Sequence, residues 1–209
     1  MTPPDDSSFV DFVVCAHDEA ETIRPVIAAI KAAASSRSVF VVADACSDAT
    51  VEIASSLGVD VYPIIARDKG TAMARGLERV RTPYVGFVDA DLEGLEGWHL
   101  DLLVSTAQEN RAMVVGARSV SIDRRETVRL AMFPPIGGER VLPTSIARAA
   151  ILAGSGYGAE IRLARSCWAA SVPIIETDLP GLHHLGEGTD LVAHLDRWLQ
   201  LAQEWFELA

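Results

Sequence analysis

The stretch that decides the fold is Tyr84-Val85-Gly86-Phe87-Val88-Asp89-Ala90-Asp91, an apolar run that stops abruptly at two carboxylates. The run predicts a buried strand at residues 84–88. Paired acids at a strand end supply the hard oxygen ligands that Mg²⁺ or Mn²⁺ prefers, and such an ion suits a nucleotide diphosphate. An aspartate after a strand is also a common turn or cap residue, so the pair alone is weak evidence. Its meaning depends on the other strand ends.

Outward from this stretch, apolar segments alternate with amphipathic ones. Predicted strands cover residues 9–15, 39–42, 59–65, 84–88 and 112–117, and predicted helices cover 22–34, 48–57, 69–81, 98–109 and 161–171. This alternation indicates an α/β fold of Rossmann-like type, with a mostly parallel central sheet and helices on both faces. Ligands of such sheets bind outside the carboxyl ends of the strands. Several charged positions after strands are therefore expected to meet at one edge, namely Glu19, Asp44, Lys69, Asp89 and Asp91.

Length, charge and cysteine content limit the class of protein. The 209 residues fit a single domain, and the net charge of -11 disfavours nucleic acid or anionic lipid as a partner. Every apolar stretch of about 18 residues contains a charge, which argues against an integral membrane segment. The start, Met1-Thr2-Pro3-Pro4-Asp5-Asp6, lacks a basic region and a long apolar segment. The three cysteines lack metal-binding spacing, so we expect buried thiols and a cytoplasmic location.

The order of the motifs resembles the family-2-type glycosyltransferases with the A-type fold. Residues 13–23 (Val-Val-Cys-Ala-His-Asp-Glu-Ala-Glu-Thr-Ile) resemble that family's opening strand and loop, usually Pro-Ala-x-Asn-Glu. Residues 41–50 (Val-Val-Ala-Asp-Ala-Cys-Ser-Asp-Ala-Thr) are similar to its Asp-Asp-Gly-Ser-x-Asp-Gly-Thr turn. Lys69-Gly70 and Asp89-Ala90-Asp91 look like its Lys-Gly helix start and its Asp-x-Asp motif. The resemblance implies a hexose-transferring enzyme that uses a nucleotide diphosphate sugar and Mg²⁺ or Mn²⁺.

The resemblance continues to about Gly186. Gly137-Gly138-Glu139-Arg140 and Gly156-Tyr157-Gly158-Ala159-Glu160-Ile161 look like acceptor-side loops of the glucosyl- and mannosyl-3-phosphoglycerate synthase branch, and His183-His184 stands where that branch has a metal-binding histidine. It divides the single domain 1–209 into a nucleotide-sugar half (8–117), an acceptor-side half (118–186) and a C-terminal helix (187–209). It implies nucleotide-sugar contacts at Ala16, Glu19, Asp44, Lys69, Asp89 and Ala90. It implies metal ligation by Asp91 and His184, with His183 as the substitute, and catalytic roles for Asp91 and Glu160.

Each of these residues also fits an ordinary structural role. Glu19 and Asp44 also fit helix caps or turns, Lys69 fits a surface lysine, and the histidine pair fits an exposed Gly-rich loop. Glu160 fits an acceptor-activating base, an acceptor ligand or a simple helix N-terminal acid. Ala43 replaces the family's first acid and His17-Asp18 its usual x-Asn, which leaves the base preference open.

Residues 118–148 form a cationic island, with six arginines against three acids in a chain of net charge -11. Guanidinium groups suit phosphate and carboxylate geometry, so the hypothesis is that this island recognises an anionic acceptor or the donor diphosphate. The alternative is ion pairing within a solvated loop. The acceptor-binding residues expected from island and branch together are Gly138, Arg140, Tyr157 and Arg125.

The predicted C-terminal helix carries a wide apolar stripe that includes Trp198, Trp205 and Phe206. Packing on the core is its expected use, with a homodimer contact as the alternative.

The sequence as a whole favours a metal-dependent glycosyltransferase with a small-molecule acceptor. One alternative is a catalytically degenerate nucleotide-sugar-binding module, suggested by alanines at positions 43, 45 and 49. The other is a sugar-nucleotide pyrophosphorylase, which is disfavoured because residues 16–22 contain no glycine for a phosphate loop.

Overall fold

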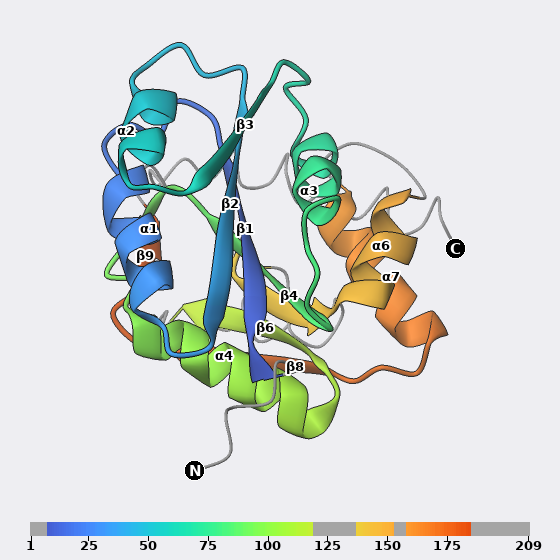
Figure 1. Cartoon of the computed structure of the whole chain (residues 1–209). Coiled ribbons are helices and arrows are strands. Elements are labelled where there is room, and N and C mark those ends of the chain that lie inside the picture. The colour runs from blue at the N-terminus through green and yellow to red at the C-terminus, as the bar shows by residue number, and fades with distance from the viewer. Residues whose placement is uncertain (1–7, 119–136, 153–157, 185–209) are drawn as a thin grey trace, which may run out of the picture.

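The strands form a mixed sheet of seven strands in the order β3-β2-β1-β4-β7-β6-β8, and helices flank it (Figure 1). The computed structural model describes residues 8–118, 137–152 and 158–184. The strands, including the small β5-β9 sheet, are β1 (Val10–Ala16), β2 (Ser36–Asp44), β3 (Asp60–Ile64), β4 (Tyr84–Asp89), β5 (Leu92–Glu93), β6 (Met113–Arg118), β7 (Arg140–Pro143), β8 (Ile174–Leu179) and β9 (His183–His184). The helices are α1 (Ile23–Ala32), α2 (Thr50–Ser56), α3 (Lys69–Leu77), α4 (Gly97–Asn110), α6 (Thr144–Leu152) and α7 (Ala159–Ala169).

The direction of the strands decides where ligands can bind. β1 pairs in parallel with β2 and β4, β2 pairs in parallel with β3, and β6 pairs in parallel with β8. β7 runs antiparallel to its neighbours β4 and β6. The carboxyl ends of β1, β2 and β4 therefore share one edge of the sheet with the amino end of β7. We call this edge the carboxyl-end rim.

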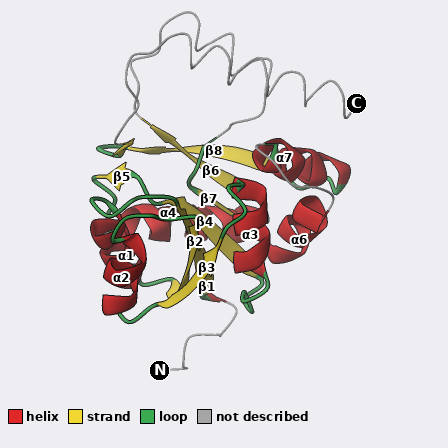
Figure 2. Ribbon diagram, turned by 90° about the horizontal axis from the view of Figure 1, so that it is seen from above, coloured by secondary structure: helices red, strands yellow, loops and turns green. Residues whose placement is uncertain are grey.

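Two hydrophobic cores lie on opposite faces of the sheet. One face is covered by α1, α2 and α4, and the other by α3, α6 and α7 (Figure 2). Successive side chains of a strand point to opposite faces. In β1, accordingly, Phe12 and Val14 belong to the first core and Val13 to the second. This explains why the strands read as continuous apolar runs instead of alternating ones.

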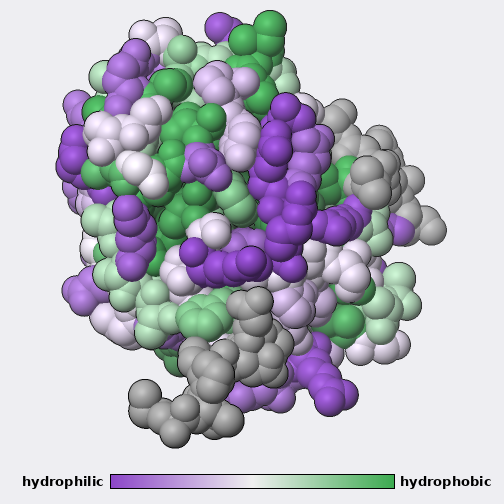
Figure 3. Space-filling model, viewed as in Figure 1, coloured by the Kyte–Doolittle hydropathy of each residue, from purple (hydrophilic) through white to green (hydrophobic). Residues whose placement is uncertain are grey.

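Helix α3 packs closely on the sheet because Gly76 has no side chain. A Cβ atom at Gly76 would lie 2.2 Å from Cγ1 of Val13, which no real contact allows. The outer face of α3 is hydrophilic, as Figure 3 shows beside a more apolar strip between α2 and α3. On that outer face Arg75 forms an ion pair with Glu78 at 2.5 Å. The close approach brings Lys69, the first residue of α3, to the carboxyl-end rim.

The predicted fold class is confirmed: the sheet is mostly parallel and has helices on both faces. Each strand and helix predicted before residue 172 is present, with ends that shift by a few residues. The largest difference is in α3, which was expected to reach residue 81 and ends at Leu77. The backbone N–H of Arg81 instead donates to the buried carboxylate of Asp11, at 2.7 Å. A partner 70 residues away therefore replaces the next helical hydrogen bond.

Several elements were not predicted, and they lie mostly in the second half of the chain. β7 and α6 fall within the segment read as an acceptor loop and cationic island, and β8 follows α7 without a prediction. The histidine pair, for which an exposed loop was the alternative to a metal-binding role, forms the short strand β9 opposite β5. The predicted C-terminal helix, residues 187–209, lies outside the described residues. Among the described helices, none has the length and apolar character needed to cross a membrane.

Candidate functional site

Charged side chains from three strand ends meet at the carboxyl-end rim, as predicted. Cys15, near the end of β1, pairs in register with Asp89 at the end of β4. Burial raises the pKa of the Cys15 thiol to about 12, against a lowering by Lys69 and with further increases from Asp89 and Asp44. These three charges can act on one thiol only because they surround the end of β1. The thiol stays protonated near neutral pH.

Negative charge accumulates between Glu19 and the two aspartates of the Asp-x-Asp motif. Glu19 lies in the loop after β1, and Thr22 Oγ1 donates to its carboxylate at 3.1 Å. Burial raises the pKa of Glu19; the Thr22 hydrogen bond opposes this, whereas the charges on Asp91 and Asp89 add to it. A place where two carboxylates raise the pKa of a third is suited to a cation.

A network of ion pairs crosses the rim from α3 to α7. Nζ of Lys69 lies 2.8 Å from Asp89 Oδ1 and 3.1 Å from Glu160 Oε1. The same Oε1 atom lies 3.2 Å from Nη2 of Arg140, whose side chain is 1% exposed. Burial would lower the pKa of Lys69, but Asp89 and Glu160 outweigh it, so the pKa is raised. The lysine is a permanent cation here and not the solvated surface residue that was the alternative.

The segment before β7 lies directly on the Asp-x-Asp motif. A Cβ atom at Gly138 would lie 1.9 Å from Oδ2 of Asp89, so a larger residue would displace that carboxylate. Arg140 Nη2 also donates to the carbonyl oxygen of Gly137. The acceptor-side residues 137–140 therefore lie against the nucleotide-sugar half, and their acceptor contacts stay a prediction. Ala16 and Ala90, also expected here, are each 3% exposed and pack in the core under the rim.

Asp44 is also at the rim, but its carboxylate is already bonded to the backbone. Its Oδ1 accepts from the N–H of Arg67 and its Oδ2 accepts from the N–H of Asp68, both at 2.8 Å. Asp44 thus holds the loop before α3, in which Arg67 has a φ of 52°. Nucleotide recognition by Asp44 stays a prediction. The alternative was a helix cap or turn residue, and the bonds of Asp44 instead fix the separate loop before α3.

The backbone brings the histidine pair next to the Asp-x-Asp motif. Leu92, the residue after Asp91, pairs with His184, and Glu93 pairs with His183. The Asp-x-Asp motif and the histidine pair are therefore linked by two adjacent strands, although 93 positions separate Asp91 from His184 in the numbering. A carboxylate and an imidazole together suit Mn²⁺, and Mg²⁺ less well.

The cationic island does not act as one surface. Arg140 lies in the ion-pair network of the rim, whereas Arg148 donates to the carbonyl oxygen of Val80, ahead of β4 at the other end of the sheet. The hypothesis that the whole segment faces one anion is wrong for Arg148. Arg125 and Tyr157 lie outside the described residues, so their acceptor roles stay predictions.

A second cluster with metal-ligand chemistry lies in the loops after β1 and β2. Ligand atoms of Asp18, Cys46 and Asp48 all lie within 4.8 Å of one another. The carboxylate of Asp18 accepts from the N–H of Ser47 at 2.6 Å, and that of Asp48 accepts from the N–H of Ala20 at 2.9 Å. These bonds tie the two loops together and explain the cluster without a metal.

Sequence reasoning missed three features of the site. They are the Cys15 thiol beneath the rim, the sharing of Glu160 between Lys69 and Arg140, and the contact of Gly138 with Asp89. The parallel order of strands signalled that the ends would meet, but the antiparallel strand β7 had no such signal. Its four residues follow two glycines and resemble a loop.

Comparisons with known proteins agree with this arrangement. The family model described as glycosyl transferase family 2 matches residues 11–154. A crystal structure of glucosyl-3-phosphoglycerate synthase from Mycobacterium tuberculosis with Mn²⁺, UDP-glucose and phosphoglyceric acid has a TM-score of 0.78 at 20% identity, covering 96% of this chain and 79% of that chain. The structure of the same enzyme with Mg²⁺ and UDP has a TM-score of 0.72 at 19% identity, and the match covers 95% of this chain and 77% of that chain. The crystal structure of a mycobacterial protein has a TM-score of 0.73 at 22% identity, and the match covers 93% of this chain and 72% of that chain. A search of curated proteins returned no significant match.

Proposed function

The chain belongs to glycosyl transferase family 2, and from this premise we propose that it transfers a hexose from a nucleotide diphosphate sugar to a small anionic acceptor with the help of Mg²⁺ or Mn²⁺. The observation that carries the proposal is the ion-pair network at the carboxyl-end rim. It places the half-buried Lys69 next to Asp89 of the Asp-x-Asp motif, and Glu160 links Lys69 to the buried Arg140. A donor diphosphate and an acid-bearing acceptor need both kinds of group.

The donor atoms at the rim fit a divalent metal. Asp91 would hold the ion, with His184 as the second protein ligand and Asp89 close to the ribose or the ion. The raised pKa of Glu19 supports this, because after burial the charges on Asp91 and Asp89 contribute to it, which brings three carboxylates near one another. When bound, the ion supplies electrostatic stabilisation of the diphosphate as the bond to the sugar breaks. Structural relatives that carry Mn²⁺ or Mg²⁺ with UDP ligands add support.

Lys69 is proposed to bind phosphate oxygens of the donor. In the structure its ammonium group contacts the carboxylates of Asp89 and Glu160, so it is oriented before a ligand arrives. A preorganised cation stabilises developing negative charge without a reorganisation cost at the moment of reaction. Its raised pKa means that it keeps this charge throughout the pH range of an assay.

Arg140 is proposed to recognise the acid group of the acceptor. Its Nε and Nη1 atoms are buried and have no hydrogen-bond partner among the described residues. Buried guanidinium donors are costly to leave unpaired. A carboxylate or phosphate group of the acceptor would offer oxygens to these charged donors. The phosphoglyceric acid in complexes of the mycobacterial synthase is an acceptor class of this chemistry.

Glu160 is proposed to orient the two cations. Its Oε1 contacts Lys69 and Arg140 together, and this leaves Oε2 for an acceptor hydroxyl. The pH dependence of kcat separates this role from that of a general base. If the Glu160 carboxylate takes the proton of the acceptor hydroxyl, Glu160→Gln removes the acidic limb of the pH profile of kcat. If Glu160 only orients the cations, the substitution lowers kcat at every pH.

The test is a transfer assay with UDP- and GDP-hexoses, Mn²⁺, and phosphoglyceric acid beside glycerol as the uncharged acceptor. We expect a glycosylated product with the acid and little or none with glycerol. Arg140→Lys should raise the KM for the acid and leave the KM for the donor unchanged. Nucleotide binding without transfer to any member of a broad acceptor panel would contradict the proposal. The cytoplasmic location and the homodimer remain predictions.

A further inference from the structure

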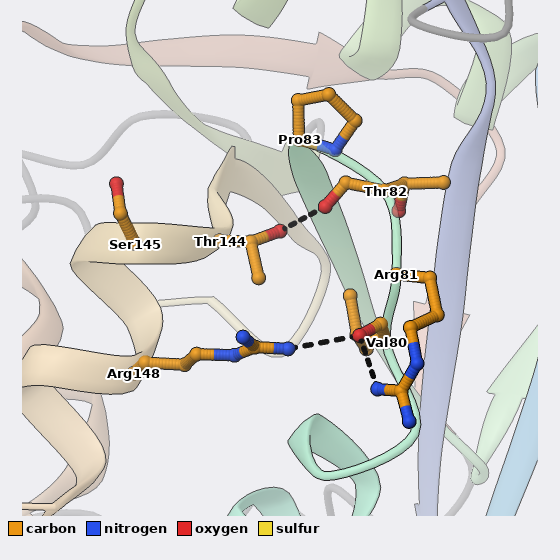
Figure 4. A pocket seen from close by; sticks show the side chains of 7 residues that line it. All are labelled: Val80, Arg81, Thr82, Pro83, Thr144, Ser145 and Arg148. Atoms are coloured by element: carbon orange, nitrogen blue, oxygen red, sulfur yellow. Dashed lines mark hydrogen bonds between the residues drawn. The ribbon is translucent and has the colours of Figure 1, made fainter.

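A cavity of about 460 Å³ lies at the opposite end of the sheet from the carboxyl-end rim. We call it the amino-end pocket. It is lined by Val80, Arg81, Thr82 and Pro83, before β4, and by Thr144, Ser145 and Arg148 of α6 (Figure 4). β4 leads from this pocket to Asp89, and β7 leads from Arg140 back to it. A volume of this size is typical of small-ligand sites.

Buried hydrogen bonds hold the two walls of the pocket together. Thr144 Oγ1 donates to the carbonyl oxygen of Thr82, and the N–H of Thr144 donates to that of Pro83, both at 2.8 Å. Thr82 Oγ1 accepts from the N–H of Asp11 at 2.9 Å. Asp11 and Thr144 are 1% and 6% exposed. The pocket is therefore preformed by the fold and does not depend on a ligand to assemble.

Two guanidinium groups converge on a single acceptor in this pocket. Arg148 Nη2 and Arg81 Nη1 donate to the same carbonyl oxygen of Val80, at 2.8 and 2.9 Å. Figure 4 shows both side chains reaching toward this oxygen from opposite walls. Each uses one terminal nitrogen for these carbonyl bonds, which leaves Nε and the second terminal nitrogen for a ligand. Two like charges brought together favour an anion between them.

The charged residues in the lining of the pocket are Arg81 and Arg148. The residues that line the pocket, all within the described part of the chain, include no Asp or Glu. Asp11 directs its Oδ2 to the backbone N–H of Arg81, and the carboxylate of Glu78 pairs with Arg75. In a chain of net charge -11 this is a local excess of positive charge. Such an excess attracts anions against the overall field of the protein.

We propose that the amino-end pocket binds the phosphate group of a small phosphorylated compound between Arg81 and Arg148. A guanidinium group can donate two parallel hydrogen bonds to two oxygens of one phosphate. Thr144 and Ser145, which also line the pocket, carry hydroxyl groups. The site is separate from the rim, because Arg140 begins β7 and the pocket lies beyond its other end. The inference therefore stands whether or not the proposed transfer reaction is correct.

The experiment is calorimetric titration of the full chain with inorganic phosphate, at constant ionic strength and with chloride as the reference anion. Arg81→Gln and Arg148→Gln should each weaken phosphate binding about tenfold or more, because each removes a charged hydrogen-bond donor. Arg75→Gln is the matched control, since Arg75 is an exposed arginine of the neighbouring helix that does not line the pocket. It should leave the affinity unchanged. Glycerol phosphate should bind and glycerol should not.

Thermal melts of the variants separate a loss of phosphate binding from a loss of folding. Arg148 also caps the carbonyl groups of Leu77 and Val80, so each variant is first melted in the absence of phosphate. If Arg148→Gln unfolds, Arg81→Gln and Arg148→Lys carry the test, and both should weaken binding. The proposal is overturned if the wild type binds no phosphate, or if Arg81→Gln binds it as the wild type does. An equal loss in Arg75→Gln would also overturn it, because attraction would then reflect diffuse surface charge.

Discussion

Two strand ends at the rim look alike in sequence and differ in the structure. Asp44 ends β2 and Asp89 ends β4, and each follows a run of apolar residues. The carboxylate of Asp44 accepts from two backbone N–H groups and is 6% exposed. The carboxylate of Asp89 contacts the ammonium group of Lys69, and its side chain is 20% exposed. One acid is bonded to the scaffold and the other to a side chain that can exchange partners.

The difference teaches that the partner of a carboxylate, and not its place after a strand, separates structure from chemistry. Backbone amides cannot leave Asp44 without unfolding the loop before α3. Lys69 can turn from Asp89 to a phosphate, because an ammonium group on a long side chain has several rotamers. We therefore expect substitutions at the β4 end to reduce activity and those at the β2 end to reduce stability.

The largest expected effect is at Asp89. Asp89→Asn keeps the shape of the side chain but removes the charge that orients Lys69 and neighbours Asp91. We expect kcat/KM to fall about 100-fold or more, with little change in melting temperature. Initial rates with a nucleotide sugar, measured beside a thermal melt, check this. A variant that keeps its activity but melts much earlier would place Asp89 in the same class as Asp44.

A smaller loss of activity is expected at Lys69. Lys69→Gln removes the cation shared by Asp89 and Glu160 and keeps a hydrogen-bond donor of similar length. We expect about a tenfold to 100-fold loss of kcat, because one preorganised donor to the diphosphate is lost. Lys31→Gln, on the outer side of α1, is the control. If both variants retain full activity, the lysine serves only as a structural ion pair.

At the β2 end, Asp44→Asn should destabilise the protein. An amide has one acceptor oxygen, so one of the two backbone N–H groups loses its bond, and the free energy of unfolding should fall by about 2 kcal/mol. Urea unfolding measures it, with the exposed acid Asp60→Asn as the control. Unchanged stability combined with lost nucleotide binding would show that Asp44 acts on the ligand, as the family resemblance predicts.

The smallest effect is the pH dependence that arises from Glu19. Burial raises the pKa of Glu19, and the charges on Asp91 and Asp89 raise it further. The folded protein then holds the proton to a higher pH than the unfolded chain, so this group lowers stability as pH rises through that range. Glu19→Gln should be slightly more stable than the wild type at neutral pH and not in acid. Mn²⁺ should reduce the difference. Glu21→Gln, an exposed neighbour, should show no such trend in urea unfolding.

The first half of the fold was predictable because its strands are long, apolar and separated by helices. The meeting of Glu19, Lys69 and Asp89 followed from the parallel order of those strands. β7 and β9 could not be predicted in this way. Their few residues become strands only because β4 and β5 offer unpaired edges, and that is tertiary information.

The site was predictable in position but not in its bonds. Sequence placed Asp44 and Lys69 at the rim, yet not the backbone partners of the one and the carboxylate partners of the other. It also assigned Arg140 and Arg148 to one cationic surface. Arg140 is the first residue of β7 and lies at the rim. Because β7 runs to the opposite end of the sheet, Arg148, about one turn into α6, lies at that end.

The most direct test of the account is a calorimetric titration of UDP and GDP into the protein with and without Mn²⁺, comparing the wild type with Asp91→Asn. We predict that Mn²⁺ strengthens nucleotide binding to the wild type, and that Asp91→Asn loses this gain while its melting temperature stays the same. If Asp91→Asn keeps the full gain from Mn²⁺, the metal and the diphosphate do not bind at the carboxyl-end rim.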